Sequence, residues 1–297
     1  MKKYIYPLCV LLSAIFWGTS GCFVRILTSL NFSTYEVVFL RLLSALLILI
    51  IGFSIFNRKA FKISLKDLWC FIGTGVVGLL GTSICYFSTI KSASLSTACI
   101  LMYTAPIFVI VFSSFLFKEK ITLIKIISLV ITFGGCILCS YTASGFSLTV
   151  PTFIIGIGSG LCYGSYSIFS RFAINRGYKA ETILIYTFIF AFLGSTLFVP
   201  YSSLINNLTK TSSYILPLLG LGVIATAVPY WLYTIGLKKT ENGRASIIAC
   251  MEIVSALMVG LILYNEIPSI YNIIGIILVF IAVIISSVKL KNTKRKS

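Results

Sequence analysis

Glu252 is the residue of this chain whose surroundings best suit it to chemistry. It lies about eight residues inside an apolar segment predicted to be helical over 245–264, so at 1.5 Å per residue it is about 10 Å below the helix end. A carboxylate at such depth normally faces a cavity or a partner. Two roles stay open for Glu252. It is either a protonatable group or counter-ion for a cationic solute, or a hydrogen-bonded brace between helices.

Arg41 is the second charged residue inside a predicted helix, about eight residues into the segment 34–56. The long apolar stem of arginine can carry its charge toward the membrane interface. We therefore interpret the role of Arg41 as structural.

Aromatic residues are plentiful, with 16 Tyr, 23 Phe and 3 Trp. Eight of them lie well inside predicted helices, away from the interfacial belts where Trp and Tyr concentrate: Trp17, Tyr86, Tyr103, Tyr163, Tyr166, Tyr230, Trp231 and Tyr233. Such rings can hold a flat or cationic organic solute by stacking and cation–π contact, and helix packing explains about half of them equally well. The residues that we expect to bind substrate are Trp17, Tyr86, Tyr103, Tyr163, Tyr230, Trp231 and Glu252.

Several kinds of chemistry are poorly supported by the composition. The chain has no His and only seven Asp and Glu, which argues against hydrolytic and metal chemistry. Cys136 and Cys139 form a CxxC pair, but no second pair or His completes a zinc site. No phosphate-binding loop is present, so ATP is not the direct energy source. We expect no cofactor, no metal and no enzymatic activity; a membrane-embedded enzyme is the disfavoured alternative.

The elements that position these residues are predicted to be membrane helices. Of 297 residues, 58% are hydrophobic and 10% are charged, against about 25% charged in a soluble domain. The mean hydropathy is +1.05. Since a span needs about 20 apolar residues, we predict an all-α integral membrane protein with ten transmembrane helices. Their approximate ranges are 6–27, 34–56, 68–90, 95–117, 121–141, 152–174, 181–200, 214–237, 245–264 and 270–288.

The net charge of +17 indicates membrane topology and not nucleic-acid binding. Alternate segments between the predicted helices contain 20 of the 24 Lys and Arg residues: those near 2–3, 58–66, 118–125, 171–179, 238–244 and 289–296. Cytoplasmic loops are the basic ones. We therefore expect a multi-pass protein of the cytoplasmic membrane with both termini in the cytoplasm.

The two halves of the chain resemble each other at nearly constant offsets. Matching pairs are Ser13 with Ser159, Gly18 with Gly164, Phe23 with Phe169, Arg25 with Arg171, Thr82 with Thr226, Tyr86 with Tyr230, Ala98 with Ala245, Ile100 with Ile247, and Glu119 with Glu266. Five helices per half is an odd number, so the second half must enter the membrane from the opposite side. The sequence predicts inverted five-helix repeats over 1–145 and 146–297, with a substrate site between them.

Several segments resemble those of the drug/metabolite transporter superfamily, in its ten-helix EamA family. These segments are FWGTS (16–20), FLRLLSALLI (39–48), LMYTAPIFVIVFSSFLFKEKIT (101–122), Tyr230-Trp231 and ASIIACMEIVSALMVGLILYNEIPS (245–269). One departure is Ile253 after Glu252, where the family often has proline. Any proline kink at that point is therefore in doubt, while Pro106 and Pro229 permit kinks elsewhere.

The resemblance implies a solute carrier, often an exporter of amino acids or other small metabolites. We expect a secondary transporter of an amino acid or amine-like solute, in the export direction, working by alternating access. The alternatives are an importer of a quaternary amine or another cationic metabolite, or a non-transporting membrane partner protein. The expected partners are the small-molecule substrate, the lipid bilayer and protons as coupling ion, with no nucleic acid. The protein is expected to be a monomer or a homodimer.

Overall fold

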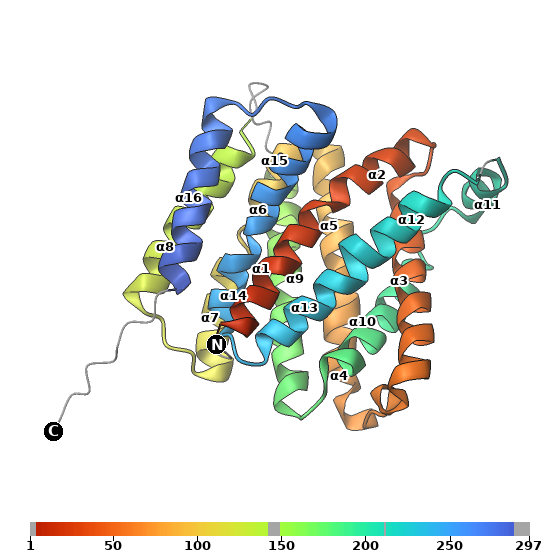
Figure 1. The fold of residues 1–297 in the computed structure, drawn as a ribbon, viewed down its shortest axis with the longest axis horizontal. Helices are drawn as coiled ribbons and strands as arrows, with labels where there is room; N and C mark the ends of the chain where they lie inside the picture. Colours follow the sequence, from red (N-terminus) through yellow and green to blue (C-terminus); the bar gives the residue numbers. More distant parts are fainter. Residues whose placement is uncertain (1–3, 142–148, 211, 288–297) are drawn as a thin grey trace.

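The computed structural model describes residues 4–141, 149–210 and 212–287 as a bundle of helices (Figure 1). The first half contains α1 (Ile5–Gly18), α2 (Ser20–Ser29), α3 (Thr34–Phe56), η1 (Arg58–Phe61), η2 (Leu65–Asp67), α4 (Leu68–Ile72), η3 (Gly73–Gly81), α5 (Thr82–Ser92), α6 (Leu95–Met102), α7 (Ala105–Phe117) and α8 (Leu123–Cys139). The second half contains α9 (Val150–Asn175), α10 (Ala180–Ser195), α11 (Tyr201–Lys210), α12 (Ile215–Gly222), η4 (Val223–Ala227), α13 (Val228–Leu237), α14 (Asn242–Ala249), α15 (Met251–Tyr264) and α16 (Ile270–Ser287). The predicted repeat boundary between 145 and 146 and the basic residues from 289 to 296 lie outside the described residues.

The predicted all-α membrane fold is confirmed. Seven described helical stretches are long and apolar enough to cross a membrane, and the shorter apolar helices α8, α10 and α16 complete the ten predicted segments. These three have 17, 16 and 18 residues, fewer than the roughly 20 that a straight span requires. The sequence therefore identified the segments correctly but made the short ones too long.

The fourth segment of each half is broken at the same repeat position. Tyr103 separates α6 from α7, and Cys250, 147 residues later, separates α14 from α15. Pro106 lies in the first turn of α7, where proline is tolerated because the amide has no helical acceptor. The second break has no proline; instead the Cys250 and Ile253 amides donate to carbonyls three residues back. The kink left in doubt by the missing proline is therefore present.

The third segment of each half contains a wide, π-helical stretch, η3 in the first half and η4 in the second. Such stretches are rare and occur mostly at functional sites. In η3, Gly78 allows close approach to α9, because a Cβ at this position would lie only 3.0 Å from the Tyr166 Cα. The same stretches supply Leu79 and Ala225 to the wall of the cavity described below.

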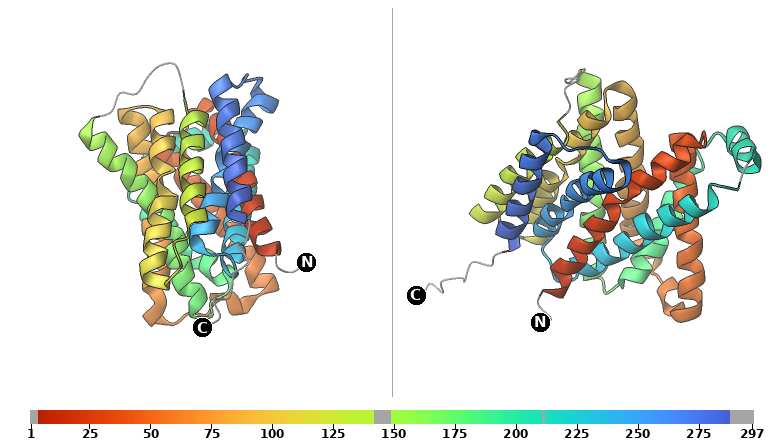
Figure 2. Two further views of the ribbon diagram at one scale, coloured as in Figure 1. Left: turned by 90° about the vertical axis from the view of Figure 1, so that its left-hand side faces the viewer. Right: turned by 45° about the horizontal axis from the view of Figure 1, so that its top comes forward.

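The basic connections gather at one end of the bundle. In Figure 1 the connections α3–α4, α7–α8, α9–α10 and α13–α14 lie at the lower end, with the start of α1 and the end of α16. The α2–α3, α5–α6 and α15–α16 connections lie at the opposite end, as both views of Figure 2 agree. We call the lower end the Glu119 end and the upper one the Arg25 end, after a residue at each.

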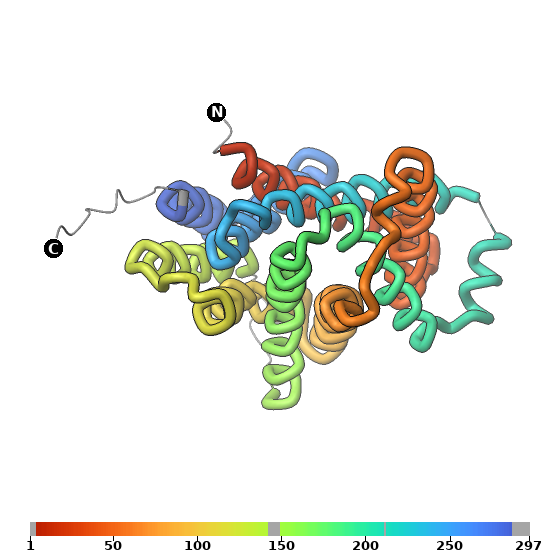
Figure 3. The backbone as a smooth tube through the Cα atoms, turned by 90° about the horizontal axis from the view of Figure 1, so that it is seen from below, coloured from red at the N-terminus to blue at the C-terminus, as the bar shows by residue number. Residues whose placement is uncertain are grey.

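The edges of the bundle differ. Helices α8 and α16 pack together at one edge, while α11 extends from the other edge beside α12 (Figure 3). The sequence predicted no helix over Tyr201–Lys210. Asn207 Nδ2 of α11 donates a hydrogen bond to the Asn31 carbonyl at 3.0 Å, which ties this helix to the α2–α3 turn.

Candidate functional site

A cavity of about 550 Å³ lies between the two halves. Its walls come from α1, α2, α3, α5, α6, α9, α13 and α15, so both repeats contribute. Arg25, Thr28 and Leu95 line it toward the Arg25 end, and Glu252 and Tyr230 line its depth. Its volume is within the 300–1,000 Å³ that small-molecule sites usually have.

Glu252 lies in the first turn of α15, directly after the break at Cys250. This position places the carboxylate near the positive end of a helix dipole, which favours negative charge. Tyr163 Oη of α9 donates a hydrogen bond to Glu252 Oε2 at 3.0 Å. Glu252 therefore both braces α15 against α9 and lines the cavity, so its two predicted roles are compatible.

Arg41 also lines this cavity, from the middle of α3. Its Nε is buried and has no hydrogen-bond partner among the described residues. Glu252 and Tyr230 of the second repeat line the same cavity. The cavity is thus lined by basic and acidic side chains from opposite repeats: Arg25 and Arg41 from the first, and Glu252 from the second.

The inner limit of the cavity is a cluster of aromatic rings, which we call the aromatic floor: Trp17, Tyr163, Tyr166, Tyr230 and Tyr233. The Trp17 ring centroid lies 5.0 Å from that of Tyr230, and Tyr230 lies 4.9 Å from Tyr166, both edge to face. Hydrogen bonds hold the floor: Tyr166 with Thr234 and Tyr233 with Ser167, each at 2.7 Å. The floor is therefore a rigid partition.

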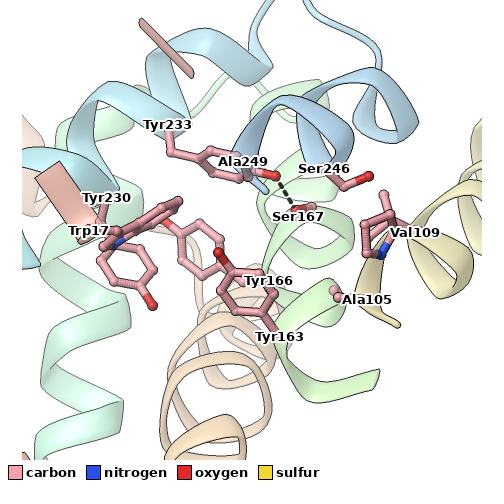
Figure 4. Close-up of a pocket in the computed structure, with 12 residues that line it drawn as sticks. Trp17, Ala105, Val109, Tyr163, Tyr166, Ser167, Tyr230, Tyr233, Ser246 and Ala249 are labelled. Carbon is pink, nitrogen blue, oxygen red and sulfur yellow. Dashed lines mark hydrogen bonds between the residues drawn. The ribbon is translucent and has the colours of Figure 1, made fainter. Parts of the chain in front are cut away.

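A second, much smaller cavity lies beyond the aromatic floor toward α7 and α14 (Figure 4). Its volume is about 20 Å³, enough for about one water molecule. Val109, Ser246 and Ala249 line its far side, and the floor rings Trp17, Tyr163 and Tyr230 line both cavities. A thin layer of rings therefore separates the large cavity from the Glu119 end.

A buried polar network closes the Glu119 end. Glu119, between α7 and α8, accepts hydrogen bonds from the Asn242 and Gly243 amides at 2.8 and 3.3 Å, which begin α14. Lys125 Nζ lies 3.6 Å from Glu119 Oε2 and 2.8 Å from Glu241 Oε2.

Arg171 of α9 completes this network. Its Nε donates to Asn242 Oδ1 at 2.9 Å, and its Nη2 donates to the Thr240 carbonyl. The network therefore joins α7, α8, α9 and α14.

Among the described residues, the Arg25 end has one exposed ion pair. Arg25 Nη1 lies 2.7 Å from Glu266 Oε1, and both side chains are 59% exposed. The Arg25 guanidinium also lies over the Tyr264 ring, 4.2 Å from its centroid. Since Arg25 lines the large cavity, this pair sits at the cavity mouth.

The structure brings together five of the seven residues predicted to bind substrate. Trp17, Tyr86, Tyr163, Tyr230 and Glu252 all line the large cavity. Tyr86 contributes from α5, and its hydroxyl lies 3.1 Å from Cys99 Sγ.

Tyr103 and Trp231 lie apart from this set. Tyr103 is buried in an apolar cluster beside Met102, which itself lines the cavity. Trp231 is 38% exposed and packs against Phe53 on the outer surface. Tyr230 lines the cavity, whereas Trp231, about 100° further round the helix, faces the outer surface. A role of Trp231 in substrate binding stays a prediction that this cavity does not support.

Sequence reasoning missed several cavity residues. Arg41 was interpreted as structural, yet it lines the cavity with an unpartnered Nε. Thr82, Ser83 and Phe87 of α5 also line it. Thr82 and Ser83 could have been found by their spacing, since residues three and four apart from Tyr86 share its helix face. Phe87 directly follows Tyr86, and no spacing signal marked it.

A helical membrane bundle of two inverted halves with a cavity between them defines a membrane transporter. The chain belongs to the EamA-like transporter family, whose model matches residues 5–141 and 150–288. It is 29% identical to an "Uncharacterized transporter" of Archaeoglobus fulgidus over 93% of this chain and 94% of that one. It is 25% identical to the "Uncharacterized inner membrane transporter YicL" of Salmonella typhimurium, over 96% of each chain. A solved structure titled "Crystal structure of protein" matches with a TM-score of 0.76, at 18% identity over 95% of this chain and 96% of that one.

Proposed function

We propose that this protein is a secondary transporter that exports a small amino-acid-like metabolite across the cytoplasmic membrane by alternating access. The observation that carries the proposal is the large cavity, where Arg41 and Glu252 from opposite repeats line one space beside aromatic rings. Arg41 is suited to a carboxylate, because guanidinium binds carboxylates in bidentate geometry. Glu252 is suited to an ammonium group, and the rings to the rest of the solute.

An importer of a quaternary amine is the second candidate. Glu252 together with Trp17, Tyr86, Tyr163 and Tyr230 resembles the aromatic cages that bind such cations. This candidate gives Arg41 no role in binding, and the two candidates therefore differ in whether the substrate needs a carboxylate.

The cavity is proposed to open away from the cytoplasm. The support is the concentration of basic residues in connections at the Glu119 end, because cytoplasmic loops are the basic ones. A topology reporter fused after Ser297 should then work only in the cytoplasm; activity on the other side would reverse the assignment.

A thermal-shift titration of the purified protein tests the substrate class. The ligands form a matched series: amino acids with apolar or aromatic side chains, their amides without the carboxylate, their N-acetyl forms without the ammonium, and choline. Stabilisation by the parent compounds alone supports the zwitterion, and stabilisation by choline and the amides supports the amine candidate. Flux of the best ligand into proteoliposomes then tests transport, and the absence of flux would contradict it.

The Arg41→Gln variant, titrated with the same ligands, tests whether Arg41 binds the substrate carboxylate. It should lose the preference for the parent amino acid over its amide, because the Arg41 guanidinium is the group proposed to bind the carboxylate. Trp231→Ala is the matched control, since Trp231 packs outside the cavity against Phe53. An unchanged preference in Arg41→Gln would exclude Arg41 as the carboxylate ligand.

A further inference from the structure

Glu119 and Glu266 occupy the same backbone turn, one at each end of the molecule. Each follows a residue in the left-handed conformation: Lys118 with φ 56° and ψ 31°, and Asn265 with φ 53° and ψ 31°. The amide of each glutamate donates at 3.2 Å to a carbonyl six residues back, that of Ser113 or of Gly260. The two glutamates are 147 residues apart, so they are equivalent in the repeat.

The two glutamates differ in what they bind. Glu119 is 11% exposed and accepts from the first two amides of α14, whose own N-cap side chain, Glu241, makes no capping hydrogen bond. A carboxylate at a helix N-terminus satisfies amides that have no acceptor inside the helix. Glu266 is 59% exposed and binds Arg25 instead.

The helix equivalent to α14 is α6, and its N-terminus lies across the cavity mouth from Glu266. The starting residues, Leu95 and Asn242, are 147 apart. Ser94 Oγ accepts from the Thr97 amide, but helix geometry gives the Leu95 and Ser96 amides no acceptor within α6. Leu95 and Arg25 both line the large cavity, so the open mouth separates the Glu266 pair from this helix end.

The arginines show the same difference. Arg171 of the closed end donates to Asn242 and to the Thr240 carbonyl, both at the start of α14. Its repeat equivalent, Arg25, donates to Glu266. At the closed end the Arg and Glu therefore both hold the short helix, and at the open end they hold each other.

We propose that Glu119 and Glu266 are reciprocal gate residues that alternately cap the N-termini of α14 and α6. In this structure Glu119 caps α14 and closes one end. When the Arg25 end closes, the Arg25–Glu266 pair separates, Glu266 accepts from the Leu95 and Ser96 amides, and Arg25 binds the chain just before α6. Glu119 then releases α14. This inference rests on the proposed alternating-access cycle but names the contacts that make and break.

Hydrogen exchange of the full-length protein in nanodiscs, without substrate, tests the proposal. The peptides to follow cover the first turns of α14 (242–246) and α6 (95–99). Glu119→Gln weakens the cap and should raise exchange at 242–246 about tenfold or more, the range expected when a charge-assisted hydrogen bond is lost. The same variant should lower exchange at 95–99, because the population moves to the state in which Glu266 caps α6. Adding Glu266→Gln should abolish that second effect.

Glu181→Gln is the matched control, because Glu181 lies in the first turn of another helix, α10, and takes no part in the Glu119 network. In this control variant, hydrogen exchange of the peptide at 95–99 should stay at the wild-type level. If Glu119→Gln does not fold, Glu119→Asp keeps the charge, shortens the reach and should shift both peptides in the same directions by less.

Three outcomes would overturn the reciprocal gate: unchanged exchange at 242–246, a rise at both helix ends, or a rise at 242–246 with no fall at 95–99. Hydrogen exchange needs no ligand, so it can support the gate proposal even if the protein does not bind amino acids. Likewise, amino-acid binding can be confirmed even if the exchange results contradict the gate.

Discussion

The two ends of this transporter are held by residues that are equivalent in the repeat, but their charged contacts differ in burial. At the Glu119 end the side chains of Glu119 and Lys125 are buried in a network that joins four helices, although Glu241 is 60% exposed. At the Arg25 end one ion pair is more than half exposed. Exposed ion pairs contribute between 0 and about 1 kcal/mol, whereas breaking a buried pair costs about 3–5 kcal/mol. The inverted repeat therefore gives the two ends a similar plan, and in this structure the charged groups of the Glu119 end are the more buried ones.

One residue has no equivalent charge at the other end. Lys125 of the Glu119 end corresponds to Asn272, 147 residues later. Asn272 Nδ2 donates to the Cys139 and Leu138 carbonyls and takes no part in the Arg25–Glu266 pair. Lys125 is therefore a cation of the Glu119 end whose repeat equivalent is uncharged.

The largest expected difference between the ends is in stability. Lys125→Met leaves the buried Glu119 and its partner Glu241 without their cation, so we expect a loss of about 3 kcal/mol, as for one partner of a buried pair. Arg25→Met should cost less than about 1 kcal/mol because its pair is exposed. Thermal unfolding of the two purified variants measures this difference. Equal shifts in Tm would show that burial does not make the ion pairs of the Glu119 end contribute more to stability than that of the Arg25 end.

Substitutions in the aromatic floor should have the next largest effect, a loss of substrate affinity. Trp17→Ala removes a ring shared by both cavities, and the lost stacking or cation–π contact of about 0.5–2 kcal/mol predicts a few-fold to roughly thirtyfold weaker affinity. Tyr86→Ala, Tyr163→Ala and Tyr230→Ala should behave similarly. Trp231→Ala should bind normally, as a tryptophan outside the cavity. Affinity is measured by titration with the ligand found by thermal shift, and normal binding by all four cavity variants would mean that the site lies elsewhere.

The last expected effect is on proton coupling, at Glu252, between the two ends. Glu252→Gln keeps an acceptor for the Tyr163 hydroxyl and should fold, but it should bind an ammonium group more weakly and lose flux driven by a proton gradient, because the amide cannot ionise. Glu252→Ala should lose about 1 kcal/mol with the hydrogen bond. The measurement is gradient-driven uptake in proteoliposomes. Unchanged uptake by the Gln variant would leave Glu252 only its bracing role.

The sequence predicted the membrane fold well because apolar length and charge placement are local signals. It could not predict the break at Cys250, where no proline marks the kink and packing determines the backbone. The amphipathic helix α11 was missed because its polar residues resemble a loop. Helix ends were also overestimated, as in α8, which the sequence extended to 121–141.

The candidate site was predicted in part. The repeat pointed to Trp17, Tyr86, Tyr163 and Tyr230, since the substrate site of an inverted-repeat transporter is expected between the repeats near their axis, and all four line the cavity. Which way Arg41 points depends on the rotation of α3 about its axis, and an apolar helix with little amphipathicity does not specify that rotation. For the same reason Trp231 could not be separated from Tyr230 without the positions of their neighbours.

The thin floor also has an electrical consequence. A hydrated cavity that reaches the floor brings the potential of its open side deep into the protein, so most of the membrane voltage falls across the rings and the Glu119 network. One elementary charge crossing 100 mV exchanges about 2.3 kcal/mol with the field. A zwitterion that crosses the floor alone carries no net charge and is indifferent to the voltage. A proton that crosses in the opposite direction during the same cycle makes the cycle electrogenic, so the ratio of current to solute flux gives the number of protons moved per molecule.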